Sequence, residues 1–404
     1  MRSSSKSQEV IKKTQKYCVK STFAYPLTIK TGKGCYLQDL DNKWYLDFNS
    51  NVSSCNLGYG HPEIMKVLEE YSEVGAHKIA GQDFYTQEQA GLAEKLIKIT
   101  PRHLKKVFFS NSGAEAVENA MKFAFRKKGP LPGVGCSRGF HGRTLGALTF
   151  TDSKAVQKRN YPEINHEMIE FCVSDDDLNI GQLEKLIQRE SAPAFLLVEC
   201  VQGEGGYRPA GRKFIKTVSK VSKKYGFPLI IDEIQSGLGR TGKWWSFQHY
   251  GITPDIMTSA KSLQVGATVA SNKYDPNESG AVSSTWGGGH RIDMAVGLKM
   301  IEVIEKEKLL KNAEIVGKYT MKKLNELKEK YPTKISDIRG IGLMIGMEFF
   351  SKKYRDLVEL NAFRCGLLTM GCGVKTLRIA PPLIINKDEI GQGLDVIEFC
   401  LKRC

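Results

Sequence analysis

The sequence predicts an α/β fold. A large domain, built on a mostly parallel sheet sandwiched by helices, is joined by a smaller α+β domain made from both chain ends. From about residue 107 to residue 270, short apolar runs alternate with longer amphipathic stretches. Continuous apolar strands separated by helices are typical of a parallel sheet covered on both faces. After residue 290, long Lys- and Glu-rich stretches with helical periodicity precede two further strand-like runs.

In chain order, the first predicted element is a β-hairpin near the N-terminus. Asp41, Asn42 and Lys43 separate the strand-like runs "CYLQD" and "WYLDF", which is a hairpin signal. In the central region, apolar runs predict strands and amphipathic stretches predict helices. The strands are expected at 107–112, 194–200, 227–232 and 255–261, and the helices at 113–127 and 214–226.

The C-terminal part of the chain has a different pattern. Residues 291–331 have helical periodicity, whereas 340–350 and 376–385 read as strands. We therefore expect three segments: 1–56 contributing to the small domain, 57–290 forming the large domain, and 291–404 completing the small domain.

Composition narrows the class of protein. Of the 404 residues, 41% are hydrophobic and 25% charged, as in ordinary soluble globular proteins. No apolar run approaches the ~20 residues needed to span a bilayer, and the N-terminus has no apolar signal core, so we expect a cytoplasmic protein without a membrane partner. The formal charge of +15 is dispersed, which indicates a solvated surface attracting anionic substrates and not a nucleic-acid interface. The ten cysteines form no CxxC pair and no Cys/His metal spacing, so no metal site is predicted.

Polar residues follow the predicted central strands where each one ends. Ser112, Glu199, Asp232 and Lys261 occupy such positions. Ligands of parallel sheets bind beyond the carboxyl ends of the strands. The functional site is therefore expected there.

Lys261 and Asp232 are the first candidates for chemistry. A lysine end is almost never buried without a role, and burial depresses its pKa and makes the amine nucleophilic, as Schiff-base formation requires. Taken alone, Lys261 could instead extend to solvent, and Asp232 could be a helix cap or an ion-pair partner. On neighbouring strand ends, the two together fit pyridoxal 5'-phosphate, whose aldehyde needs a lysine and whose pyridine nitrogen needs a carboxylate.

The phosphate of such a cofactor requires an anion site. Ser112, Gly113 and Ala114 lie where a predicted strand gives way to a helix. Backbone N–H groups and the helix dipole favour a dianion at this position. Gly113 permits close backbone approach, and the Ser112 hydroxyl can donate.

Six ordered motifs carry a family resemblance: SGAEA, FHGRT, VQGEGG, IIDEIQSGLGRTG, DIMTSAKS and STWGGG. With them, the chain resembles the class III, fold-type I, pyridoxal-phosphate-dependent aminotransferases from residue 46 to residue 385. Within that family it is most similar to the 4-aminobutyrate, lysine-6 and ornithine aminotransferase branch. The stretch "AKSLQVGATVA" departs from the glycine-rich run that many members have after the lysine, and this leaves the amino donor open.

The resemblance implies the contacts to the cofactor. Phe140 would stack on the pyridine ring, and His141 would help to close the same wall. Asp232 would bind the ring nitrogen and Gln235 the phenolic oxygen. Lys261 would form the Schiff base and then act as general base.

The resemblance also implies a shared active site. Thr285 would reach the phosphate held by the neighbouring subunit, so the enzyme is expected to be a homodimer. Glu233, next to Asp232, would be a supporting and not a catalytic carboxylate.

Substrate binding is expected to rest on two arginines. Arg378 resembles the family residue that binds the α-carboxylate of 2-oxoglutarate or glutamate in a bidentate fork, and Arg143 resembles the one that takes the distal carboxylate. Glu204 resembles the acidic gate that pairs with Arg378 while an ω-amine substrate is bound. Val52 falls where the branch has a small apolar wall residue.

These expectations lead to a functional prediction. The protein is predicted to transfer the amino group of 4-aminobutyrate to 2-oxoglutarate, giving succinate semialdehyde and glutamate. The alternatives are a lysine 6-, ornithine or acetylornithine aminotransferase, followed by a pyridoxal-phosphate-dependent racemase. Outside the enzymes, the net charge of +15 leaves a nucleic-acid-binding protein on the same fold as the remaining alternative.

Overall fold

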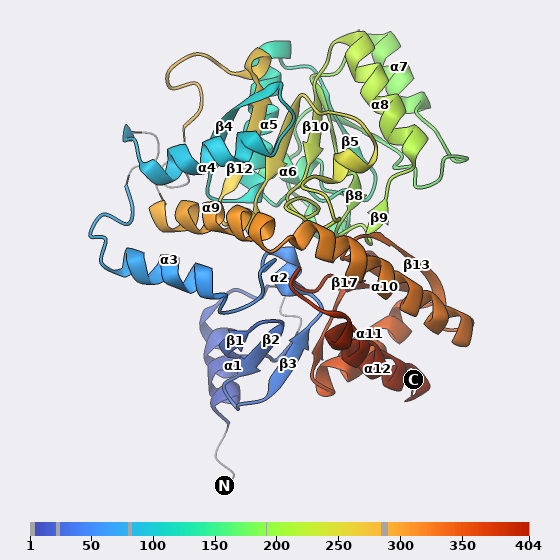
Figure 1. Ribbon diagram of the computed structural model, residues 1–404. Helices are drawn as coiled ribbons and strands as arrows, with labels where there is room; N and C mark the ends of the chain where they lie inside the picture. Colours follow the sequence, from blue (N-terminus) through green and yellow to red (C-terminus); the bar gives the residue numbers. More distant parts are fainter. Residues whose placement is uncertain (1–4, 22–24, 80–82, 191, 284–289, 404) are drawn as a thin grey trace.

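The computed structural model describes residues 5–21, 25–79, 83–190, 192–283 and 290–403. Figure 1 shows two parts, with the long helices α9 (Arg291–Lys306) and α10 (Leu309–Lys330) running between them. The larger part lies on one side of these helices, and both chain ends lie on the other.

A seven-stranded sheet forms the centre of the larger part, in the order β4-β12-β11-β10-β7-β5-β6. Its strands are β4 (Leu104–Ser110), β5 (Gly133–Cys136), β6 (His166–Ile169), β7 (Phe195–Val198), β10 (Leu229–Asp232), β11 (Ile256–Ser259) and β12 (Gly266–Ser271). All pairs from β11 to β6 are parallel, whereas β12 is antiparallel to both of its neighbours. The predicted α/β class with a mostly parallel sheet is confirmed.

Successive residues of the central strands point to opposite faces of the sheet, and each face has its own core. Ile230 and Ile256 belong to the core that α5 (Gly113–Lys128) covers, whereas Ile231 and Met257 belong to the larger core on the other face. This two-sided burial explains why the strands are continuously apolar. The other helices of the larger part are α4 (Gln87–Lys98), α6 (Leu145–Thr149), α7 (Gly181–Glu190) and α8 (Arg212–Tyr225), and a short β-ribbon joins β8 (Val201–Gln202) to β9 (Arg208–Pro209).

The smaller part combines segments from both halves of the chain. The predicted N-terminal hairpin is present as β2 (Tyr36–Asp39) and β3 (Trp44–Asp47), preceded by β1 (Ile29–Lys33). It pairs in parallel with β15 (Leu367–Leu368), which confirms a small domain built from both ends. A second sheet has the order β13-β14-β17-β16, with β13 (Ile335–Ile341), β14 (Met344–Phe349), β16 (Met370–Cys372) and β17 (Thr376–Ile379). The exact domain limits remain a prediction.

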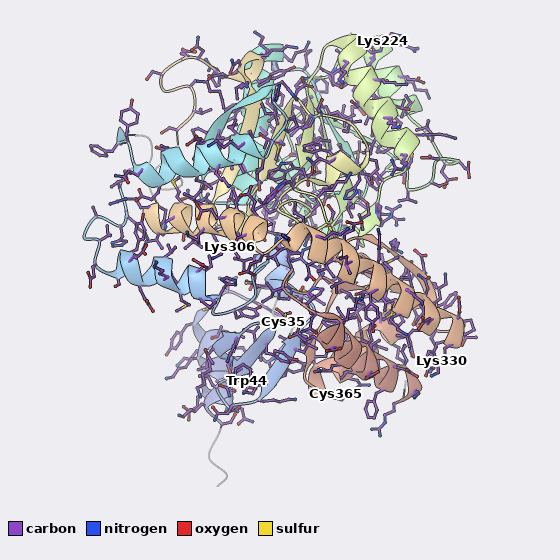
Figure 2. The ribbon with its side chains drawn as sticks, in the orientation of Figure 1. Cys35, Trp44, Lys224, Lys306, Lys330 and Cys365 are labelled. Carbon is purple, nitrogen blue, oxygen red and sulfur yellow. The ribbon has the colours of Figure 1, made fainter. Side chains whose placement is uncertain are left out.

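The remaining helices surround these sheets. They are α1 (Lys6–Tyr17), α2 (Ser50–Ser53), α3 (Pro62–Ser72), α11 (Lys352–Arg364) and α12 (Lys387–Arg403). Within the described ranges, no helix is long and apolar enough to cross a bilayer. Lys224, Lys306 and Lys330 lie on separate parts of the surface, as Figure 2 shows, in keeping with dispersed basic charge.

The predicted central strands and helices differ from the observed ones by up to three residues at their ends, and three other predicted elements differ more. The run 340–350 is not one strand: its first residues end β13, and the chain turns at Gly342, whose φ is +60°, before β14 begins. The run 376–385 is a strand only as far as Ile379, because Pro381 and Pro382 follow and proline cannot donate a ladder hydrogen bond. The helical stretch 291–331 is broken at Lys308, whose φ is +56°.

Candidate functional site

The carboxyl ends of β10 and β11 bring Asp232 and Lys261 to one cavity. Asp232 pairs in register with Thr258 of β11, and Lys261 begins the 3-10 turn that follows this strand. The two side chains line a cavity of about 250 Å³. Its other lining residues come from the first turn of α5 and from several loops, namely Gly113, Ala114, Phe140, His141, Gly142, Glu199, Ile234, Gln235 and Ala260.

Lys261 has the protonation behaviour that a nucleophilic amine needs. Burial of its side chain, together with the positive charge of Arg378, lowers its pKa to about 8. The acidic groups of Glu204, Asp232 and Glu199 oppose this shift without cancelling it. At such a pKa, about a tenth of the amine is unprotonated at pH 7, compared with less than about a thousandth at the ordinary lysine value.

Asp232 is a buried carboxylate with three hydrogen-bond donors around it. Only 4% of its surface is exposed. One oxygen lies 2.8 Å from Nδ1 of His141, and the other accepts from the backbone N–H of Ile234 at 3.0 Å and the hydroxyl of Thr258 at 3.3 Å. This network fixes the orientation of the carboxylate at the cavity wall.

His141 connects Asp232 to the "FHGRT" segment. Burial alone would lower the pKa of His141, but the hydrogen bond and negative charge of Asp232 raise it above its ordinary value. Its second nitrogen, Nε2, is buried without a partner in the described part of the chain. His141 therefore lies next to Asp232 at the cavity and helps to fix the orientation of its carboxylate.

Glu199 also lines the cavity, and its position at a strand end was the only feature predicted for it. Its two oxygens accept from the backbone N–H of Phe140 at 3.0 Å and of Gly203 at 2.9 Å. Burial raises its pKa to about 7. Glu199 thus links Phe140, the aromatic residue that lines the cavity, to the "VQGEGG" loop.

Gln235 lies where three segments meet. Its amide Nε2 donates to the backbone oxygen of Val52 at 3.4 Å. A Cβ atom on Gly203 would lie 1.6 Å from Oε1 of Gln235, so only glycine permits this approach. The predicted grouping of Gln235, Asp232 and Lys261 in one cavity is observed.

The N-terminus of α5 opens onto the same cavity. Gly113 and Ala114 line it, whereas Ser112 is not among the lining residues. The Ser112 hydroxyl caps the helix by accepting from the N–H of Glu115 at 3.2 Å. The first turn therefore presents backbone N–H groups and the positive end of the helix dipole to an anion.

Arg378 and Glu204 form an ion pair between β17 and the "VQGEGG" loop. Nη2 of Arg378 lies 2.6 Å from Oε1 of Glu204 and 3.3 Å from the backbone oxygen of Gly371. Arg378 is 1% exposed, and its Nε and Nη1 have no partner in the described residues. The guanidinium therefore keeps donors available for a further carboxylate.

Arg143 is separate from this pair. Its side chain is exposed and does not line the cavity. Its guanidinium lies 5.8 Å from the ring centroid of Phe140, within cation–π range. The structure thus places Arg143 beside the aromatic wall, on the solvent side.

Val52 belongs to a strained turn. Residues 50–53 all have positive φ, and φ is +57° at Val52, an uncommon conformation for a β-branched side chain. Ser53 accepts a hydrogen bond from the hydroxyl of Ser262, so the turn is held against the loop that carries Lys261. Thr285 lies outside the described residues.

These groups fit pyridoxal phosphate. The cavity offers a lysine with a lowered pKa, a buried carboxylate held on three sides, and a helix N-terminus for the phosphate. In the parts of the chain that the structure covers, no group of three or more His, Cys, Asp or Glu side chains could hold a metal ion.

Comparisons with known proteins agree with this chemistry. The family profile of class-III aminotransferases matches residues 17–401. An acetylornithine aminotransferase from Archaeoglobus fulgidus is 34% identical, covering 96% of this chain and 99% of the relative. A lysine aminotransferase from M. tuberculosis, solved in its internal aldimine form, superimposes with a TM-score of 0.90 at 26% identity, covering 98% of this chain and 99% of its own.

A third similar protein is the ornithine aminotransferase of Toxoplasma gondii. Its structure superimposes with a TM-score of 0.89 at 26% identity, covering 99% of this chain and 96% of its own. The predicted family and cofactor are confirmed. The chain belongs to the class-III aminotransferases and is a pyridoxal-phosphate-dependent transaminase.

Proposed function

We propose that the enzyme transfers the terminal amino group of N-acetylornithine, or of a related ornithine- or lysine-type donor, to 2-oxoglutarate. The names of its relatives support this choice, because they include acetylornithine, lysine and ornithine aminotransferases. They favour these alternatives over 4-aminobutyrate, the donor preferred from the sequence.

The contact between Arg378 and Glu204 is the observation that carries the proposal. An ω-amine donor has its carboxylate far from the reacting amine, whereas 2-oxoglutarate has one next to its reacting carbonyl. While Glu204 neutralises Arg378 at 2.6 Å, a donor can lie with its apolar chain near this pair and its carboxylate towards Arg143. When Glu204 withdraws, Arg378 can bind the α-carboxylate of 2-oxoglutarate as a fork.

The residues predicted to contact the cofactor have distinct proposed roles. Pyridoxal phosphate, when bound, supplies an electron sink that stabilises negative charge at the substrate carbon. Lys261 would hold the aldehyde until the amine of the donor displaces it, and its freed Nζ would then accept and return the substrate proton. Asp232, which is oriented by its contact with His141, keeps the pyridine nitrogen protonated.

The remaining roles concern positioning. Phe140 covers one face of the ring and excludes water, and Gln235 binds the phenolic oxygen. Gly113 and Ala114, with the Ser112 cap, hold the phosphate. Val52 forms the apolar wall.

The enzyme is proposed to act as a homodimer in which Thr285 reaches the neighbouring subunit's phosphate. Its partners are then an amino donor, 2-oxoglutarate and a second copy of the chain. Sedimentation at several concentrations tests the dimer. A monomer with full activity would contradict it.

A steady-state panel tests the substrate proposal. Purified enzyme is assayed for glutamate formation from 2-oxoglutarate with N-acetylornithine, ornithine, lysine and 4-aminobutyrate. We expect the highest kcat/KM with N-acetylornithine or a basic amino acid. A highest kcat/KM with 4-aminobutyrate would restore the sequence-based choice, and no glutamate from any of the four would overturn the proposal.

A further inference from the structure

Glu204 has a second cation within reach besides Arg378. Its Oε1 contacts Arg378 at 2.6 Å, while its Oε2 lies 3.9 Å from Nζ of Lys154. The Lys154 side chain is 43% exposed, whereas that of Arg378 is 1% exposed. Glu204 therefore lies between a buried cation and a solvent-facing one.

The backbone that carries Lys154 is anchored beside the cofactor cavity. Asp152 donates its N–H to the oxygen of Gly139 at 2.7 Å, and its carboxylate accepts from the N–H of Arg138 at 2.8 Å. The next residue along from Gly139 is Phe140, the aromatic wall. The chain two residues before Lys154 is thus tied to the segment that carries Phe140.

Displacing Glu204 from Arg378 creates an energetic problem. The Glu204 carboxylate is only 17% exposed. A buried carboxylate that loses its partner is strongly disfavoured. Burial alone would raise the pKa of Glu204, and the charges of Arg378, Lys261 and Lys154 lower it instead. The carboxylate therefore stays ionised and needs a cation wherever it moves.

We infer that Lys154 is the second ion-pair partner of Glu204. The Glu204 carboxylate moves to Lys154 when a dicarboxylate substrate binds Arg378. This inference rests on the proposed role of Arg378 and names a residue that positions Glu204 without touching substrate. Rotation of the Glu204 carboxylate towards Lys154 lengthens one ion pair and shortens the other. It also brings the charge from a buried to a half-exposed position, where its solvation improves.

Lys158 provides a matched control. It lies on the same loop with the same charge, but its ammonium already has the Glu163 carboxylate at 2.8 Å. If Lys154 acted only by adding positive charge near the cavity, Lys158→Gln would have a similar though smaller effect. If Lys154 acts through Glu204, Lys158→Gln has none.

Glutarate binding to the holoenzyme tests the inference directly. Glutarate has the two carboxylates of 2-oxoglutarate and no oxo group, so calorimetry measures its affinity without turnover. We expect Lys154→Gln to weaken glutarate binding by about threefold to fivefold, the range of a partly exposed ion pair. The Lys154→Arg and Lys158→Gln variants should both retain the glutarate affinity of the parent. In steady state, Lys154→Gln should raise the KM for 2-oxoglutarate and leave the KM for the amino donor unchanged.

A double-mutant cycle separates the gate from a general field effect. In a Glu204→Gln background the carboxylate is gone, so adding Lys154→Gln should no longer change glutarate affinity. An equal loss in both backgrounds, or no loss in either, would overturn the inference. The Arg378→Lys variant distinguishes a failure of the Lys154 inference from a failure of the proposed function. If this variant binds glutarate as tightly as the parent, Arg378 is not the carboxylate site and the proposed function is wrong. If Arg378→Lys weakens binding but Lys154→Gln does not, only the role of Lys154 is wrong.

Discussion

Removal of the Asp232 charge is the sharpest test of the cofactor site. Asp232→Asn keeps the shape of the side chain and one acceptor oxygen, but it removes the negative charge from a position that is 4% exposed. The substitution also changes His141, because Asp232 supplies the hydrogen bond and the charge that hold the pKa of His141 up against burial. We expect the pKa of His141 to fall below its ordinary value.

The size of the effect follows from one charged hydrogen bond. Such a bond to the pyridine nitrogen contributes about 1.5–3 kcal/mol, so cofactor affinity should fall by about 10- to 150-fold. The half-reaction with amino donor should slow by at least the same factor, because the ring nitrogen is no longer kept protonated. Titration of the apoenzyme with pyridoxal phosphate measures the affinity, and single-turnover absorbance measures the half-reaction.

Glu233→Gln is the matched control. Glu233 is also buried at the end of β10, but its oxygens accept from the hydroxyls of Ser236 and Ser246 and do not line the cavity. Its loss should change cofactor affinity by less than about threefold. If Asp232→Asn behaved like this control, the assignment of Asp232 to the ring nitrogen would be refuted.

Three further outcomes are expected. Burial lowers the pKa of Lys261 to about 8. In the apoenzyme, competitive labelling of lysines followed by mass spectrometry should therefore give Lys261 a titration midpoint near 8. A midpoint above about 10, the ordinary value for lysine, would contradict this. Burial raises the pKa of Glu233 from 4.5 to about 7, so its contribution to stability is fully present below about pH 4.5 and is lost as the pH rises through about 7. As the pH rises from about 4.5 to about 8, the free energy of unfolding of Glu233→Gln should therefore increase by up to about 3 kcal/mol relative to that of the parent. Urea unfolding at several pH values measures this difference. A difference that does not vary with pH would disprove the reasoning. Gly203→Ala would place a Cβ 1.6 Å from Oε1 of Gln235, the far end of a flexible side chain. We expect this amide to be displaced, so cofactor binding should weaken while the free energy of unfolding falls by no more than about 1 kcal/mol. Unchanged cofactor affinity would contradict the role of Gln235 at the cofactor.

The central features of the site were predictable because they follow from a local pattern and a general rule. The apolar runs ending at Asp232 and shortly before Lys261 are strands β10 and β11, and parallel pairing brings their carboxyl ends together. The same reasoning missed β12. Only six residues, 260–265, separate β11 from β12, too few for a crossover, so the strand returns antiparallel.

Other features depend on contacts between distant segments and leave no local signal. The left-handed turn at 50–53 is held by Arg240, which is 0% exposed and donates to the Ser50 hydroxyl at 3.0 Å and to Oδ1 of Asn56 at 2.6 Å. In the sequence, Arg240 lies within the motif IIDEIQSGLGRTG, but nothing in that motif indicates its contacts with Ser50 and Asn56. Glu199 is similar, because its role depends on the loop that brings the Phe140 N–H to within 3.0 Å. The rule that polar residues follow the strand ends predicted where Glu199 lies, but it did not predict its hydrogen-bond partners.

The attachment point of the cofactor tests the account most directly. Borohydride reduction of the holoenzyme fixes pyridoxal phosphate to the amine that holds it, and peptide mass spectrometry then identifies that residue. We predict a phosphopyridoxyl adduct on the peptide containing Lys261 and its absence in Lys261→Ala. An adduct on any other lysine of the native enzyme would contradict the account.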